Sequence, residues 1–209
     1  MEVTAIIPAF NEEERIANVL EAVKASSLVN RIIVVDDGSE DRTAEVAEKM
    51  DVMVIKNDKN MGKGGALCKG LRNCTSEVIL FLDADLCGLE PKDIDAMLIP
   101  VISGNYDMTI GIFANGRLTT DLAQKVAPFL SGQRAIKRKI LNDISGLEIS
   151  RYGAEVALTR YVKKNEVRLK EVTLEHVSHI MKEEKLGIIR GFTERLKMYW
   201  DIVKALRIK

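Results

Sequence analysis

The first 90 residues alternate short apolar runs with segments of helical spacing, and no other feature constrains the fold as strongly. The expected strands are Val3–Pro8, Arg31–Asp36, Asp51–Lys56 and Glu77–Leu82. The expected helices between them are Glu12–Ser26, Arg42–Met50 and Gly64–Asn73, the first capped by Asn11. Strand alternating with helix produces parallel βαβ units with right-handed crossovers. The chain therefore predicts an α/β fold, with a Rossmann-like, mainly parallel sheet and helices on both faces.

The second half of the chain is less regular. Helical spacing predicts Pro91–Ile102, Tyr152–Asn165, Ile188–Leu206 and two short helices within Thr119–Leu141. Strands are expected at Met108–Phe113 and, at an edge of the sheet, Val167–Leu174. No internal repeat or low-complexity linker divides the chain, so residues 1–209 are predicted to form a single domain.

Composition argues against several classes of protein. Lys+Arg and Asp+Glu balance at 31 each, so no overall charge favours nucleic acid. Cys68, Cys74 and Cys87 have no C-x-x-C spacing, which argues against structural zinc or a disulfide framework and favours a reducing cytoplasm. We find no signal-peptide pattern and no apolar run near the roughly 20 residues that span a bilayer. A cytoplasmic protein is expected.

Two acids, Asp83 and Asp85, end the apolar run that begins at Val78. Since an unpaired buried charge costs roughly several kcal/mol, both should lie at the carboxyl edge of the sheet, where open α/β folds bind ligands. Carboxylate oxygens there suit Mg²⁺ or Mn²⁺ shared with substrate phosphates. A polar turn after a strand is the alternative explanation of the pattern taken alone.

The loops argue against two common nucleotide sites. The first strand-to-helix turn, Pro8 to Glu13, has no glycine, whereas a dinucleotide site requires G-x-G-x-x-G. The sequence around Lys63 lacks the spacing of an ATP-binding phosphate loop. Glycine amides, a helix N-terminus and a lysine charge still favour an anion site at Lys63, with a flexible turn as the alternative.

Four motifs in the first half resemble those of the family 2 nucleotide-sugar glycosyltransferases, which adopt the GT-A fold. The motifs are Ile7-Pro8-Ala9-Phe10-Asn11-Glu12-Glu13, Val35-Asp36-Asp37-Gly38-Ser39 with Asp41 and Thr43, Asn60-x-Gly62-Lys63-Gly64, and the DxD motif Leu82-Asp83-Ala84-Asp85. The resemblance implies that residues 1–90 bind a UDP- or GDP-sugar and that residues 91–209 bind the acceptor and include a C-terminal helix.

The resemblance also implies roles for loop residues at the strand ends. They are Pro8, Ala9 and Glu12 at the nucleoside, Asp36 or Asp37 at the base, Lys63 at the diphosphate, Asp83 at the ribose and sugar, and Asp85 at Mg²⁺ or Mn²⁺. With the metal bound to both phosphates, Asp85 is an expected catalytic residue.

The second half is similar to a narrower group, the glucosyl-3-phosphoglycerate and mannosylglycerate synthase type. Ser131-Gly132-Gln133-Arg134 is similar to the group's glycine-arginine loop, and Tyr152-Gly153-Ala154-Glu155 to its G-Y-G-x-E stretch, with Arg151 in place of the usual glycine. The resemblance implies that this loop lies at the acceptor and sugar pocket, with Gly132 contributing to donor binding. Arg134, on the acceptor side, and Glu155, facing the donor sugar, are implied to be catalytic residues. It also implies that His179 is a metal ligand, with His176 the second choice.

Simpler explanations stay open for three of these residues. His179, near a strand end, could be a surface or capping residue. Glu155 could begin a helix, where the helix dipole favours an acid. Arg134 is followed by Lys137, Arg138 and Lys139, and this basic run could form a solvated helix face. An arginine beside a glycine is equally suited to capture a carboxylate or phosphate with two hydrogen bonds.

The predicted function is metal-dependent hexosyl transfer from a nucleoside-diphosphate sugar to a small phosphorylated acid, a polyprenyl phosphate or a glycan. Inversion, with Glu155 as base, and retention both stay open. The alternatives are a sugar-phosphate nucleotidyltransferase and a non-catalytic nucleotide-sugar-binding protein. The segment 192–207 has apolar helical spacing with interleaved basic residues. It could contact the inner membrane face, pack on its own core or join a homodimer.

Overall fold

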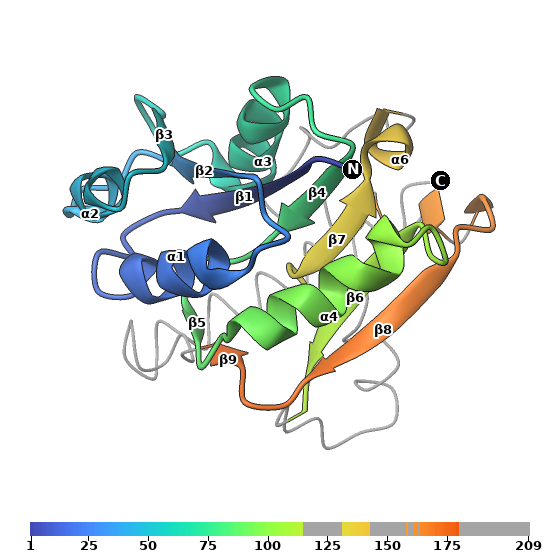
Figure 1. Cartoon of the computed structure of the whole chain (residues 1–209). Helices are drawn as coiled ribbons and strands as arrows, with labels where there is room; N and C mark the ends of the chain where they lie inside the picture. The colour runs from blue at the N-terminus through green and yellow to red at the C-terminus, as the bar shows by residue number, and fades with distance from the viewer. Residues whose placement is uncertain (115–130, 143–157, 159–160, 163, 180–209) are drawn as a thin grey trace, which may run out of the picture.

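The computed structural model describes residues 1–114, 131–142, 158, 161–162 and 164–179 (Figure 1). Its elements in chain order are β1 (Val3–Ala9), α1 (Ile16–Ala25), β2 (Arg31–Asp36), α2 (Thr43–Lys49), β3 (Met53–Lys56), α3 (Gly62–Arg72), β4 (Val78–Phe81), β5 (Leu86–Cys87), α4 (Pro91–Ile102), β6 (Met108–Phe113), β7 (Arg134–Lys137), α6 (Arg138–Asn142), β8 (Leu169–Leu174) and β9 (Ser178–His179).

Seven of these strands form one sheet in the order β3-β2-β1-β4-β7-β6-β8. The strands β1 to β4 pair in parallel, as do β6 and β8. Strand β7 runs antiparallel to both of its neighbours, β4 and β6. A separate antiparallel pair joins β5 to β9. The predicted mainly parallel sheet is confirmed, and β8 lies at its edge as expected.

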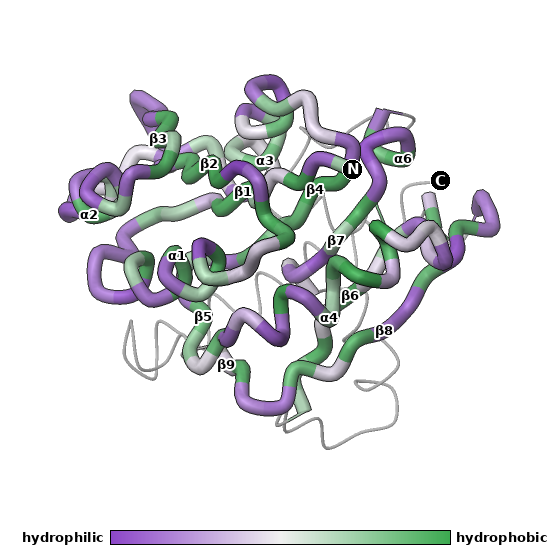
Figure 2. The backbone as a smooth tube through the Cα atoms, viewed as in Figure 1, coloured by the Kyte–Doolittle hydropathy of each residue, from purple (hydrophilic) through white to green (hydrophobic). Residues whose placement is uncertain are grey.

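The sheet is buried on both faces, which explains why its strands are nearly continuous apolar runs. In β1, Val3, Ala5 and Ile7 face one core, which α1 and α4 complete, whereas Ile6 faces a second core with residues of α3 and α6. Figure 1 shows α1 and α4 side by side across the near face, and Figure 2 shows hydrophobic strands joined by hydrophilic turns. The predicted helices on both faces are confirmed.

The helix Pro91–Ile102 and the strand Met108–Phe113 have the predicted bounds. The expected start of the first helix was wrong, because α1 begins at Ile16 and Asn11 does not cap it. Asn11 has φ +55°, and its Oδ1 accepts the backbone N–H of Glu40 at 2.9 Å. The polar groups of this turn are therefore satisfied by a neighbouring loop.

The prediction of two short helices within Thr119–Leu141 was wrong for Arg134–Lys137, whereas the short helix α6 agrees with it in part. Arg134–Lys137 is strand β7, and α6 follows from Arg138. Ala135 faces one core and Ile136 the other. A strand buried on both faces lacks the alternation of polar and apolar residues that marks a strand in the sequence. Pairing with β4 and β6 overrides the weak local preference of this segment for helix. Arg134 therefore lies in a buried strand and not on a solvated helix face.

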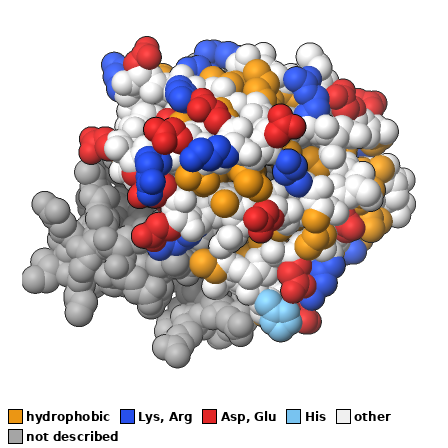
Figure 3. All heavy atoms as spheres, turned by 60° about the vertical axis from the view of Figure 1, so that its left-hand side comes forward, with side chains coloured by type: hydrophobic (Ala, Val, Ile, Leu, Met, Phe, Trp, Pro, Cys, Tyr) orange, Lys and Arg blue, Asp and Glu red, His pale blue; other side chains and the backbone are white. Residues whose placement is uncertain are grey.

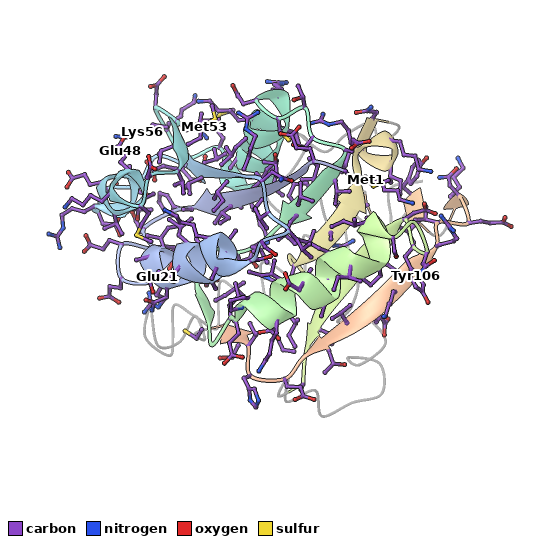
Figure 4. The ribbon with its side chains drawn as sticks, in the orientation of Figure 1. Met1, Glu21, Glu48, Met53, Lys56 and Tyr106 are labelled. Atoms are coloured by element: carbon purple, nitrogen blue, oxygen red, sulfur yellow. The ribbon has the colours of Figure 1, made fainter. Side chains whose placement is uncertain are left out.

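The other edge of the sheet is the four-residue strand β3. Its Met53 is exposed, and at its end Lys56 forms an exposed ion pair with Glu48 of α2 at 2.8 Å (Figure 4). A short edge strand with a lysine resists pairing with another chain.

Asp107 connects the strands of the second half. It lies immediately before β6 and is bonded to Arg168, before β8, at 2.9 and 3.0 Å, and to Lys137 of β7 at 2.9 Å. Its side chain is only 13% exposed. The hydrogen bonds from Arg168, opposed by burial and assisted by Lys137, hold the pKa of Asp107 well below its ordinary range. The carboxylate thus joins three strands of the sheet.

We expect Asp107→Asn to lower the free energy of unfolding by about 2 kcal/mol at pH 7, the scale of hydrogen bonds to a charged group. Because folding lowers the pKa of Asp107, its stabilisation is present above the ordinary pKa of about 4 and is lost as pH falls further. Urea unfolding of both proteins should therefore show a difference that shrinks below about pH 4. A difference that is constant from pH 7 to pH 3 would contradict this role.

Candidate functional site

The predicted nucleotide-binding residues lie at strand ends, in the loops that follow them and in the first turn of α3, at one edge of the sheet. The register of the parallel strands pairs Ala9 with Asp36 and Ile6 with Phe81, so the carboxyl ends of β1, β2 and β4 lie together. Open α/β sheets bind their ligands at this edge. The fold thus brings together the four motifs that are far apart in the sequence.

The loops after β1 and β2 are bonded to each other. The backbone N–H of Glu12 donates to Thr43 Oγ1 at 2.8 Å, and that of Glu13 to Asp41 Oδ2 at 3.1 Å. Burial raises the pKa of Asp41, but hydrogen bonds from Thr43 and from the backbone of Glu13 outweigh it, and the net pKa is lowered. The Glu12 carboxylate lies 3.5 Å from Arg15. These contacts fix the first loop, which follows the half-buried Pro8 and the buried Ala9 at the end of β1.

Asp36 and Asp37, although adjacent, have different partners. The Asp36 carboxylate, at the end of β2, accepts the hydroxyl of Ser39, and Ser39 Oγ accepts the backbone N–H of Asn11 at 3.0 Å. Asp36 thereby faces the loop after β1. Its side chain is buried, as is that of Asp37.

Asp37 is bonded to the segment that precedes Lys63. Its Oδ1 accepts the side-chain amide of Asn57 at 2.7 Å and the backbone N–H of Met61 at 2.9 Å, and its Oδ2 accepts the backbone N–H of Gly62 at 2.8 Å. These bonds explain why α3 begins at Gly62, two residues before the predicted start. Asp37 therefore determines where Lys63 lies.

Lys63 and Asp83 form the centre of the site. Lys63 Nζ lies 2.5 Å from Asp83 Oδ1, and the two side chains are 26% and 17% exposed. Gly132 lies against both, because a Cβ atom added there would collide with Lys63 Nζ and with both carboxylate oxygens of Asp83. Two predicted donor residues and the predicted pocket glycine, far apart in sequence, are thus in contact.

Asp85, which is half-buried, follows in the connection between β4 and β5. The β5–β9 pairing places the backbone of His179 opposite Leu86, the residue after Asp85. The side chain of His179 lies outside the described part of the structure. His176 is exposed and precedes β9. Among the described residues, no three His, Cys, Asp or Glu side chains are grouped so that they could hold a metal ion.

Arg134 is buried at the start of β7, where it pairs with Phe81 of β4. Its Nε donates to the carbonyl oxygen of Ser131 at 2.9 Å, which fastens the loop that carries Gly132. Glu155 and the segment 192–207 lie outside the described residues.

Sequence reasoning missed two residues of this site. Asn57 supports Asp37, and Gln133 donates to Asp83 at 2.9 Å. Both are buried. A buried amide at a strand end requires a hydrogen-bond partner, and this requirement could have indicated both residues from the sequence.

The face of the molecule seen in Figure 3 carries interspersed acidic and basic side chains, with hydrophobic atoms scattered between them. Within the described ranges, no helix is both long and apolar enough to cross a bilayer.

The chain belongs to glycosyl transferase family 2, whose family model matches residues 4–167. It is 31% identical to an uncharacterized protein of Methanocaldococcus jannaschii, over 94% of this chain and 90% of that one. It is 28% identical to UDP-N-acetylglucosamine--dolichyl-phosphate N-acetylglucosaminyltransferase of Methanococcus voltae, over 82% of this chain and 84% of the relative.

The structure is also similar to that of glucosyl-3-phosphoglycerate synthase from Mycobacterium tuberculosis, solved with Mn²⁺, UDP-glucose and phosphoglyceric acid. The TM-score is 0.74 at 24% sequence identity, over 86% of this chain and 71% of that one. The predicted family and GT-A fold are confirmed, and family membership favours glycosyl transfer over nucleotidyl transfer.

Proposed function

We propose that this protein is a metal-dependent glycosyltransferase that moves a hexose from a nucleoside-diphosphate sugar to a phosphorylated acceptor. The observation that carries the proposal is the contact of Lys63, Asp83 and Gly132 at the carboxyl edge of a family 2 fold. The relative from M. voltae is named for dolichyl phosphate, and the mycobacterial structure holds phosphoglyceric acid. A phosphate group on the acceptor is common to both.

In this proposal the first 90 residues bind the donor. Asp36 reads the base beside Pro8, Ala9 and Glu12, since the Asp37 carboxylate is already bonded to Asn57 and the start of α3. Lys63 neutralises the diphosphate as charge develops on it. Asp83 orients the ribose and sugar.

The residues after β4 fit a divalent cation by their chemistry. Asp85 offers hard carboxylate oxygens, which suit Mg²⁺ or Mn²⁺ together with substrate phosphates. Imidazole is a common metal ligand, and the β5–β9 register, which brings the backbone of His179 near Asp85, supports His179 in this role. When bound, the ion would stabilise negative charge on the leaving diphosphate.

Residues 91–209 would bind the acceptor, with Arg134 on the acceptor side and Glu155 facing the donor sugar. The whole chain is proposed to act as one domain in the cytoplasm. Contact of the segment 192–207 with the inner membrane face is supported by the relative named for dolichyl phosphate, a lipid. Sedimentation with anionic vesicles and measurement of the mass in solution test this contact and a homodimer.

The donor is identified by incubating the protein with UDP-, GDP- and ADP-sugars and Mn²⁺, with 3-phosphoglycerate or dolichyl phosphate as acceptor. We expect one nucleotide to raise Tm only when Mn²⁺ is present, and its sugar to be transferred. Lys63→Ala should weaken binding of that nucleoside diphosphate about 10- to 100-fold. This range corresponds to about 1.5–3 kcal/mol for a hydrogen bond to a charged group.

Lys59→Ala is the matched control, because Lys59 is an exposed lysine of the loop that leads from β3 into α3, just before Lys63. It should bind the nucleotide as the wild-type protein does. If no nucleotide binds in the presence of Mn²⁺, or if both lysine variants bind equally well, the proposed donor site is wrong.

A further inference from the structure

Gln133 is a fully buried residue of the loop that begins at Ser131, immediately before β7. Its Nε2 lies 2.9 Å from Asp83 Oδ2, and its Oε1 lies 3.0 Å from the Ser131 hydroxyl. Its backbone N–H donates to the same hydroxyl at 3.2 Å, and its carbonyl accepts the N–H of Gly111 at 2.9 Å. Each polar group of Gln133 thus has a partner, so its amide has a fixed orientation.

This orientation has a chemical reason. A carboxylate can only accept hydrogen bonds, so the amide nitrogen of Gln133 must face Asp83 and its oxygen must face Ser131. The single hydroxyl hydrogen of Ser131 is shared between Gln133 Oε1 and the carbonyl oxygen of Gly111, and the contact with Gly111, at 2.6 Å, ties the loop to β6. A Cβ atom on Gly111 would lie 3.1 Å from the Cβ of Gln133, so glycine leaves the room that the glutamine needs.

The Asp83 carboxylate is therefore held from two sides. Lys63 Nζ contacts Oδ1, and Gln133 Nε2 donates to Oδ2. The two donors differ in mobility, because the lysine is a charge on a flexible stem whereas the glutamine is buried and bonded at every polar group. The Lys63 side chain can turn towards a diphosphate, whereas the Gln133 side chain stays bonded to Asp83.

We propose that Gln133 is a positioning residue that holds Asp83 ready for the ribose and sugar while Lys63 engages the diphosphate. This inference rests on the proposed function and deepens it. Gln133 acts through Asp83 and does not itself contact the donor. Its loss should therefore weaken donor binding only when Asp83 is present.

A double-mutant cycle tests this dependence. The proteins are the wild type, Gln133→Met, Asp83→Ala and the double variant, each titrated calorimetrically up to millimolar concentration with UDP or GDP, whichever the wild type binds with Mn²⁺. Methionine matches glutamine in length and shape but cannot donate. We expect Gln133→Met to weaken binding about tenfold in the wild-type background and less than about twofold in the Asp83→Ala background.

A purely structural role would weaken binding equally in both backgrounds, and that result would overturn the inference. So would unchanged binding by Gln133→Met or by Asp83→Ala. If the wild type binds neither nucleotide, the proposed function fails and this inference falls with it. If the wild type binds and only the cycle is additive, the proposed function stands without the positioning role.

The matched control is Thr109→Val, which removes another buried hydrogen bond. Thr109 lies on β6, is fully buried and donates to the carbonyl oxygen of Met97 at 2.8 Å, away from Asp83. Its nucleotide affinity should stay within about twofold of wild type. If Gln133→Met does not fold, Gln133→Asn replaces it in the cycle, since asparagine keeps the amide but is one methylene too short to reach Asp83.

Discussion

Replacing Asp85 with alanine is expected to lower sugar transfer about a thousandfold and to abolish the effect of Mn²⁺ on nucleotide binding. A bound cation contributes several kcal/mol of charge stabilisation, and about 1.4 kcal/mol corresponds to a tenfold change in rate. Asp85 lies just after β4, next to the residue that pairs with His179. The measurement is nucleotide affinity with and without Mn²⁺, together with the rate of nucleoside diphosphate release.

Two further variants serve as a control and as a test of the second metal ligand. Glu21→Ala removes an exposed carboxylate of α1 and should change neither quantity. His179→Ala should reduce the dependence on Mn²⁺ if this histidine completes the metal site. Undiminished Mn²⁺ dependence in Asp85→Ala would show that the cation binds elsewhere.

Replacing Asp37 with alanine is expected to lower the free energy of unfolding by about 3 kcal/mol, the upper end for hydrogen bonds to a charged group. The substitution leaves the N–H groups of Met61 and Gly62 and the amide of Asn57 without their carboxylate acceptor. The start of α3 should loosen, and nucleotide binding should weaken because Lys63 is no longer fixed. Urea unfolding followed by circular dichroism measures the first effect.

Asp58→Ala is the control for this experiment. Asp58 is an exposed acid of the loop between β3 and α3, which the Asp37 carboxylate contacts, and such surface substitutions usually change stability by less than about 0.5 kcal/mol. The free energy of unfolding of Asp37→Asn should lie between those of Asp37→Ala and Asp58→Ala, because the amide retains one oxygen acceptor. Equal stabilities of Asp37→Ala and Asp58→Ala would mean that the Asp37 contacts contribute nothing.

The half of the fold with regular βαβ units could be predicted from sequence because each element carries its own periodicity. Arg31–Asp36 has the predicted bounds, and β1, β3 and β4 differ from them only at their ends. Strand β7 was not predictable in this way. Its residues Arg134–Lys137 form a strand because β4 and β6 flank them, and neither partner is near them in sequence.

The candidate site is likewise divided into residues that the sequence predicts and contacts that it does not. Residues at strand ends, such as Asp36 and Asp83, could be placed because the carboxyl edge of a parallel sheet is the expected site for ligands. The contact of Gly132 with Lys63 could not be predicted from the sequence. It depends on where a loop that is distant in sequence returns to the sheet. Roles for Glu155 and His179 stay predictions from the resemblance.

The bonds from Asp37 to the start of α3 also affect how this fold can hold phosphate. A helix N-terminus attracts anions because its first N–H groups are unpaired and carry partial positive charge. In α3 a carboxylate already accepts from Met61 and Gly62, so an incoming diphosphate meets a helix end that is partly neutralised. In the proposed function, the ammonium of Lys63 and the divalent cation would then supply the attraction. The flexible side chain of a lysine can move with the departing phosphates, whereas the backbone amides of a helix N-terminus are fixed in place.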